Sequence, residues 1–280
     1  MKTNIKTMKD ITVIIPVHKL NTKDEQFLKK AVYSYLSNVK TYTHGDLFLI
    51  IISSKEAYKN VTKLAESALN NEISNYSIII NNGETDYCSQ INTAVKSVKT
   101  DLFSILEMDD EYSSKWFEMM YPWYQSNNSV SVFLPLNVQY NEEHTKWQYG
   151  NELVWANSFS NELGVIDFDC LENCSTFNLT GGVFNTEDFV NIGGFKPSIK
   201  VAFNYEFLLR LTNKKLKAIV VPKEGYKHLI GRENSLTETY EKTIEADSIQ
   251  KWFELAKCEY PFIEDRKRTI VMETKQEILK

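Results

Sequence analysis

One stretch near the beginning decides the fold of this chain: Ile11-Thr12-Val13-Ile14-Ile15-Pro16-Val17. A short run of β-branched residues with a proline near its end is typical of a buried strand that stops at a loop. Residues 24–39 follow it and carry apolar side chains at helical spacing. We therefore predict that the chain begins as a strand followed by a helix.

The same alternation continues outward through the first half of the chain. Further buried strands are predicted at 47–52, 76–80 and 102–106, and further helices at 56–69 and 89–98. Buried strands separated by amphipathic helices indicate a mostly parallel sheet with helices on both faces. The expected fold class is α/β, and in such sheets ligands bind beyond the carboxyl ends of the strands.

The second half is less regular. Strand-like stretches occur at 131–138 and 216–221, and helical spacing recurs at 203–212 and 235–257. Aromatic residues are dense between these stretches, and those at 116–124 are interpreted as core. The pattern predicts a mixed extension packed on the same sheet and a C-terminal helical tail.

Composition excludes several classes of protein. The 280 residues include 37 acidic and 32 basic side chains, and the formal net charge of −5 argues against a broad basic face for nucleic acid. The longest apolar runs are far shorter than the ~20 residues of a membrane span, and 1–10 do not have the pattern of a signal peptide. We expect a cytoplasmic protein without stable membrane insertion and with reduced cysteines.

The predicted strand at 102–106 runs directly into an acidic segment, Glu107-Met108-Asp109-Asp110-Glu111. Like charges at one strand end destabilise a fold unless a cation or hydrogen-bond donors neutralise them, and Mg²⁺ and Mn²⁺ prefer oxygen ligands. A solvated acidic turn would have the same composition. The surrounding motifs decide between the two interpretations.

Six segments carry these motifs in a fixed order. They are 11–18, Ser89-Gln90-Ile91-Asn92-Thr93-Ala94, Leu106-Glu107-Met108-Asp109-Asp110, Asn191-Ile192-Gly193-Gly194-Phe195, Tyr205-Glu206-Phe207-Leu208-Leu209-Arg210-Leu211, and His228 with Arg232 and Ser235. In order and spacing, over about 11–237, they resemble the family 2 glycosyltransferases. These are inverting enzymes of the GT-A fold that use nucleotide-diphosphate sugars, and the ordered series is more specific than any one motif.

The resemblance implies a set of binding residues. Those expected to bind the nucleotide sugar are Pro16, Val17, His18, Ser53, Asn82, Gln90, Asn92, Glu107, Met108, Asp109 and Arg232. Those expected on the acceptor side are Asp110, Gly182, Gly193, Gly194 and Tyr205. It also implies a Mn²⁺ or Mg²⁺ ion, held by Asp109 and His228, that neutralises the diphosphate leaving group.

Two departures from the family pattern bear on specificity and catalysis. The second strand leads into residues 53–55, Ser-Ser-Lys, where the family carries an Asp pair, and this leaves the nucleotide base open. Phe203 and Asn204 stand where a Glu-Asp pair is usual, and an Asn cannot accept a proton at neutral pH. Glu206 is therefore the candidate base beside Asn204, although two helical positions differ by about 200° in direction.

The predicted organisation is a GT-A domain over 1–237 with a helical tail over 238–280. Within the domain, about 1–112 form the nucleotide-sugar half and 113–237 the acceptor half. This is what the family resemblance implies for the less regular second half.

The predicted function is metal-assisted transfer of a sugar, hexose or pentose, to an acceptor hydroxyl with inversion. The acceptor stays open between a glycan, a lipid-linked sugar, a protein and a hydroxymethylated base in DNA. One alternative is a non-catalytic nucleotide-sugar binder, for which Asn204 argues. A less favoured alternative is a nucleotidyltransferase, because 16–20 lack the glycines of a triphosphate-binding loop.

Overall fold

The computed structural model describes residues 9–69, 72–84, 86–141, 143, 146–156, 162–232 and 235–260. The first half alternates strands and helices as the sequence predicts. In chain order its elements are β1 (Ile11–Val17), α1 (Asp24–Thr41), β2 (Leu47–Ser54), α2 (Tyr58–Leu69), β3 (Tyr76–Asn81), α3 (Tyr87–Val95) and β4 (Leu102–Ile105).

The second half adds shorter and more varied elements. They are β5 (Glu111–Tyr112), α4 (Trp116–Ser126), β6 (Val130–Tyr140), β7 (Lys146–Gly150), the 3₁₀ turn η1 (Glu152–Trp155), β8 (Val165–Ile166), α5 (Phe168–Asn173), β9 (Val183–Asn185), α6 (Thr186–Asn191), α7 (Phe203–Asn213), β10 (Lys217–Leu229), α8 (Leu236–Thr243) and α9 (Ala246–Glu259).

A single mixed sheet runs through both halves. Its order is β3-β2-β1-β4-β9-β6-β10-β5, with β7 beside β6 and β8 beside β10. The four strands of the first half are parallel, whereas β9 lies antiparallel between β4 and β6. Because the chain passes from β1 to β2 and β3 on one side and returns to β4 on the other, the carboxyl ends of β1 and β4 flank a switch point.

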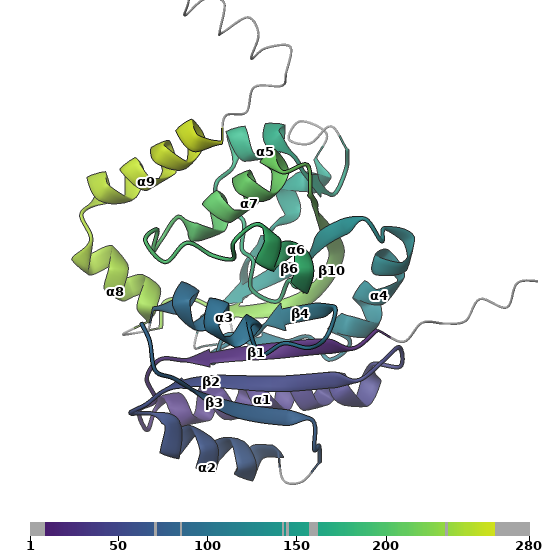
Figure 1. Cartoon of the computed structure of the whole chain (residues 1–280), viewed down its shortest axis with the longest axis vertical. Coiled ribbons are helices and arrows are strands. Elements are labelled where there is room, and N and C mark those ends of the chain that lie inside the picture. Colours follow the sequence, from purple (N-terminus) through teal and green to yellow (C-terminus); the bar gives the residue numbers. More distant parts are fainter. Residues whose placement is uncertain are drawn as a thin grey trace, which may run out of the picture.

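The sheet has an apolar core on each face. Side chains alternate along β1, so Val13 and Ile15 belong to the cluster that includes α1 and α2, whereas Ile14 belongs to the cluster that includes α3 and α7. Figure 1 shows α1 and α2 on one side of the sheet and α3, α6 and α7 on the other. Burial on both faces explains why β1 is apolar throughout.

Several expected elements differ from the structure. The predicted helix at 235–257 is two helices, α8 and α9, with a break at residues 244–245. The strand predicted at 216–221 continues to residue 229 through several register shifts, and the aromatic stretch at 116–124 forms α4. No helix among the described residues combines the length and apolar character needed to cross a membrane.

Candidate active site

A cavity of about 400 Å³ lies at the carboxyl ends of β1 and β4. Both halves of the chain contribute to its lining. The lining residues are Pro16, His18, Tyr87, Gln90, Glu107, Met108, Asp109, Lys200, Phe203, His228, Leu229, Ile230, Gly231, Arg232, Ser235 and Tyr240.

Strand pairing brings the acidic segment to His228. In the antiparallel ladder of β5 and β10, Tyr112 is opposite Tyr226, which places Asp110, just before β5, beside the end of β10. The Asp110 Oδ2 atom lies 2.9 Å from His228 Nδ1, and its Oδ1 atom accepts a hydrogen bond of 2.8 Å from the Leu229 N–H. Asp110 is fully buried, so it fixes the imidazole from inside the fold.

Glu107 completes a group of potential metal ligands with Asp110 and His228. One ligand atom from each residue lies within 4.8 Å of the others. Two carboxylates and an imidazole suit Mn²⁺ and Mg²⁺ in donor type, and their spacing suits a shared ion. The residues present therefore fit the cation that the resemblance implies.

The pKa values in this group reflect its acidic excess. Burial, together with the nearby Asp110 carboxylate, raises the pKa of Glu107 to about 8. Burial opposes protonation of His228, but the Asp110 carboxylate and its hydrogen bond outweigh it and raise the pKa of His228 to about 10. Without a cation, protons neutralise part of the acidic excess.

Asp109 points to a different partner. Its Oδ2 atom accepts a hydrogen bond of 2.6 Å from Arg232 Nε, and Arg232 Nη1 lies 3.2 Å from Oδ1 of Asp24 in the first turn of α1. All three side chains are nearly buried. Burial and the Asp110 carboxylate raise the pKa of Asp109, while Arg232 acts in the opposite direction. We call Asp24, Glu107, Asp109, Asp110, His228 and Arg232 the cavity cluster.

His18 faces the same arginine. Burial and then the positive charge of Arg232 lower the pKa of His18, so its imidazole is neutral at pH 7. The Arg232 guanidinium also lies 5.9 Å from the ring centroid of Phe27 on α1. The guanidinium is thus held from several sides at the rim of the cavity.

The structure brings together only part of the predicted nucleotide-sugar set. The members that line the cavity are Pro16, His18, Gln90, Glu107, Met108, Asp109 and Arg232. Val17 and Ser53 are buried within strands, Asn82 is exposed after β3, and Asn92 binds the backbone of Phe195 through both atoms of its amide. For the metal, His228 belongs to the group with Glu107 and Asp110, whereas Asp109 is paired with Arg232.

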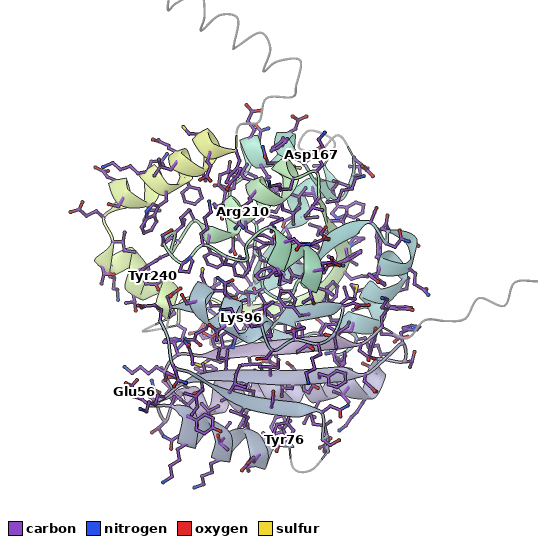
Figure 2. The ribbon with its side chains drawn as sticks, in the orientation of Figure 1. Glu56, Tyr76, Lys96, Asp167, Arg210 and Tyr240 are labelled. Carbon is purple, nitrogen blue, oxygen red and sulfur yellow. The ribbon has the colours of Figure 1, made fainter. Side chains whose placement is uncertain are left out.

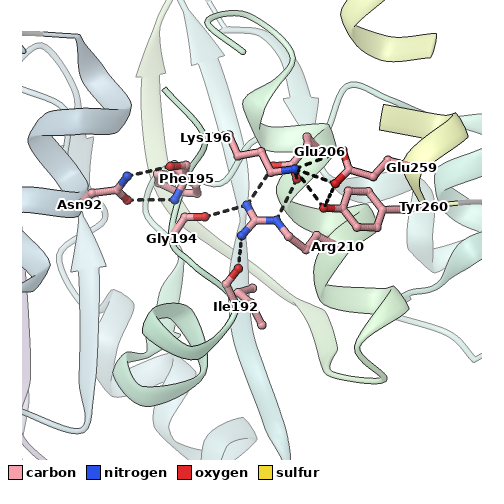
Figure 3. Close-up of polar contacts among 9 residues, drawn as sticks. All are labelled: Asn92, Ile192, Gly194, Phe195, Lys196, Glu206, Arg210, Glu259 and Tyr260. Carbon is pink, nitrogen blue, oxygen red and sulfur yellow. Dashed lines mark hydrogen bonds and ion pairs between the residues drawn. The ribbon is translucent and has the colours of Figure 1, made fainter. Parts of the chain in front are cut away.

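Glu206, the candidate base, does not line the cavity. It is fully buried and accepts hydrogen bonds of 2.8 and 2.9 Å from Arg210, one turn later on α7. Lys196 Nζ lies 3.1 Å from the same carboxylate. Figure 3 shows these three residues, which we call the loop clamp, meeting between α7 and the loop after α6. An acid in this position has no access to an acceptor in the cavity.

The loop clamp also binds backbone carbonyl groups. Arg210 Nη1 donates to the carbonyl of Ile192, and Nη2 donates to that of Gly194 at 2.7 Å (Figure 3). Gly194 has a φ of +65°, and a Cβ there would lie 2.4 Å from Oδ1 of Asn92. The glycines and Asn92 therefore build a tight turn, and sequence reasoning had placed them on the acceptor and nucleotide-sugar sides.

The other predicted acceptor and catalytic residues also lie outside the lining. The Tyr205 hydroxyl donates to the Leu171 carbonyl at 2.6 Å, and a Cβ at Gly182, just before β9, would lie 2.7 Å from Cδ2 of Leu134. Asn204 has a buried side-chain oxygen for which the described residues supply no hydrogen-bond partner. Glu206 and Asn204 thus occupy the helix that the resemblance indicates, without reaching the cavity.

Several residues of the site lie outside the sequence motifs. Lys200 and Tyr240 line the cavity but belong to no motif, and Phe203 was noted only as a departure from the family pattern. Asp24, which holds Arg232, sits at the start of an ordinary amphipathic helix. Asp110 was expected on the acceptor side, and only the β5–β10 pairing reveals it beside His228. Long-range pairing over more than 100 residues cannot be inferred from local periodicity.

The fold and the cavity together define an α/β protein with an acidic, histidine-bearing candidate ligand site at the switch point of a mixed sheet. Residues 12–180 match the family model of Glycosyl transferase family 2. Because the match spans more than half of the chain, the chain belongs to this glycosyltransferase family. The search of curated protein sequences found no match.

Solved structures share the fold at low sequence identity. This chain is similar to S. aureus TarS 1–349 in complex with UDP-GlcNAc, with a TM-score of 0.66, 13% identity, 89% of this chain covered and 66% of that chain. For TarS 1–349 in complex with UDP the corresponding values are 0.61, 14%, 94% and 70%. For a longer S. aureus TarS chain they are 0.57, 11%, 92% and 50%. The chain therefore has a GT-A glycosyltransferase fold and spans half to about two thirds of these TarS chains.

Proposed function

We propose that this protein transfers a sugar from a nucleotide-diphosphate sugar to an acceptor hydroxyl with inversion, assisted by Mn²⁺ or Mg²⁺. The observation that carries the proposal is the group Glu107, Asp110 and His228 at the end of β4, beside a cavity large enough for a ligand of this class. Membership of the glycosyltransferase family supports the reaction, and the TarS complexes favour UDP-GlcNAc as the first donor to test.

The metal would be held by Glu107, Asp110 and His228, and when bound it supplies positive charge for the departing diphosphate. Arg232 has a second role in this proposal. Its guanidinium lines the cavity while Asp24 and Asp109 hold it in place, and such a planar group suits phosphate oxygens. The Asp109 carboxylate would then serve mainly to orient Arg232.

The test is a thermal-shift panel of UDP, GDP, CDP and TDP, with and without Mn²⁺, followed by UDP-GlcNAc. A ligand at 100 times its dissociation constant stabilises the folded state by ~2.7 kcal/mol. We expect one nucleotide to stabilise the protein in a Mn²⁺-dependent manner and Glu107→Gln to remove that dependence. Glu111→Gln is the matched control, because Glu111 belongs to the same acidic segment but neither lines the cavity nor joins the metal group. Equal loss in both variants would contradict the proposed site.

A second candidate function is nucleotide-sugar binding without transfer. It is favoured by Asn204 in the position expected for a base and by the burial of Glu206 in the loop clamp. Measuring UDP release from UDP-GlcNAc in the wild type and in Asn204→Asp separates the two. Turnover by the wild type supports transfer, whereas turnover by Asn204→Asp alone supports binding without transfer.

A further inference from the structure

The C-terminal helices α8 and α9 contact the loop of residues 195–202, which follows the turn at Gly193 and Gly194. Lys196 of this loop donates to Glu259 at 3.2 Å and to the Tyr260 hydroxyl at 3.0 Å, both at the end of α9. Figure 3 shows these contacts meeting the loop clamp. Tyr205 of α7 adds a ring contact of 5.5 Å with Phe253 of α9. The helices therefore pack on the domain that the sequence predicted to end before them.

The same loop meets α8 at the cavity. Lys200 Nζ lies 5.5 Å from the ring centroid of Tyr240, and both residues line the cavity. Figure 2 labels Tyr240 on α8, close to α3. Phe203 also lines the cavity, and its ring centroid lies 5.3 Å from that of Tyr87 on α3. We call Lys200, Phe203 and Tyr240 the wall. The aromatic rings of Phe203 and Tyr240 and the Lys200 ammonium thus form one part of the cavity wall that comes from the second half of the chain.

The position of the wall can be compared with the order of groups in a nucleotide sugar, which is nucleotide, diphosphate, sugar. Pro16 and His18 lie at the end of β1, and the cavity cluster lies at the switch point between β1 and β4. If the cluster holds the diphosphate, the nucleotide extends toward β1, and the next group beyond the diphosphate is the sugar. The wall of Lys200, Phe203 and Tyr240 belongs to the part of the lining outside β1 and the cavity cluster.

The wall also lies beyond the stretch that matches the family model. The family match ends at residue 180, and Lys200, Phe203 and Tyr240 all follow it. A lysine ammonium and a tyrosine hydroxyl can bond sugar hydroxyls, while aromatic rings pack against the apolar face of a sugar ring.

We propose that Lys200 and Tyr240 contact the transferred sugar and determine which nucleotide sugar is accepted. This inference rests on the proposed function and deepens it. It makes α8 a part of the donor site, in place of the separate tail that the sequence predicts. The contact is specific for the sugar, so it leaves the affinity for the free nucleotide unchanged.

The experiment compares the affinities for UDP and UDP-GlcNAc in Mn²⁺ by titration calorimetry, using the full chain. Tyr240→Ala and Lys200→Ala are each expected to weaken UDP-GlcNAc binding about tenfold, the effect of one lost hydrogen bond or ring contact, and to leave UDP binding unchanged. Thr243→Ala is the control, because Thr243 is exposed on the same helix and lies outside the cavity lining. Lys200 is exposed, so its variant tests the inference even if Tyr240→Ala fails to fold.

The outcomes distinguish this inference from the proposed function. If the variants lose affinity for UDP and UDP-GlcNAc in parallel, or lose affinity for neither, the sugar contact is overturned. Nucleotide binding by the wild type, and with it the proposed function, would still stand. A wild-type protein that binds neither any nucleotide nor any nucleotide sugar overturns the proposed function and this inference with it. A selective loss for the nucleotide sugar supports both.

Discussion

The cavity cluster and the loop clamp are both buried groups of charged residues, yet they differ in balance. The loop clamp pairs Glu206 with Arg210 and Lys196. Its Arg210 also donates hydrogen bonds to two backbone carbonyls. The cavity cluster has four carboxylates against one arginine and one histidine, and it borders a cavity. One carboxylate held by two cations, without access to the cavity, serves the fold, whereas an acidic excess beside a cavity suits a cation.

The largest expected effect is on the loop clamp. Glu206→Ala leaves Arg210 buried without its carboxylate, so we expect the free energy of unfolding to fall by about 3–5 kcal/mol. Urea denaturation followed by circular dichroism measures this. Glu187→Ala, which removes an exposed acid from α6, is the control and should change stability little. A Glu206→Ala variant with full stability and no turnover would restore Glu206 as the base.

The cavity cluster should respond to substitution in ligand binding. Asp110→Asn keeps the size of the side chain but removes the charge of a proposed metal ligand that also fixes His228. We expect Mn²⁺ affinity to fall at least 10–100-fold, the usual effect of losing a partner that orients a metal ligand. Calorimetric titration with Mn²⁺ gives the affinity, and Glu111→Gln again serves as the control. Unchanged affinity would remove Asp110 from the metal site.

The contrast between the clusters also explains what the sequence could predict. The strands of the first half and the acidic segment at the end of β4 follow from local patterns, and the structure confirms them. Asp110 and His228 meet only because β5 pairs with β10. Glu206 faces Arg210 and Lys196 only because its position on α7 points its side chain toward them. Residue type identifies an acid, but its partner depends on tertiary contacts that local spacing does not encode.

A smaller effect is expected at the edge of the cavity cluster. Asp24→Asn removes one of the two carboxylates that hold Arg232, while Asp109 keeps the other hydrogen bond. We expect UDP affinity in Mn²⁺ to weaken by about tenfold, which corresponds to ~1.4 kcal/mol. Glu25→Gln changes the neighbouring acid on α1, which makes no ion pair among the described residues, and should leave affinity unchanged. Equal effects of the two variants would assign the loss to α1 as a whole.

A pH dependence of stability is also expected, and the cavity cluster contributes to it. The folded-state pKa of Glu107 is about 8 and that of His228 about 10, both above their ordinary values, so the folded protein binds more protons than the unfolded chain. Stability of the metal-free protein should therefore fall as pH rises from 6 to 9, by at most ~1.4 kcal/mol per pH unit for each proton.

Urea unfolding at a series of pH values measures this slope, and Glu107→Gln should reduce it because one of the two groups is removed. Saturating Mn²⁺ should also flatten or reverse the slope, because the cation replaces the protons and binds more tightly as they leave. A slope that is unchanged both in Glu107→Gln and in the wild type with Mn²⁺ would place the titrating groups outside the cavity cluster.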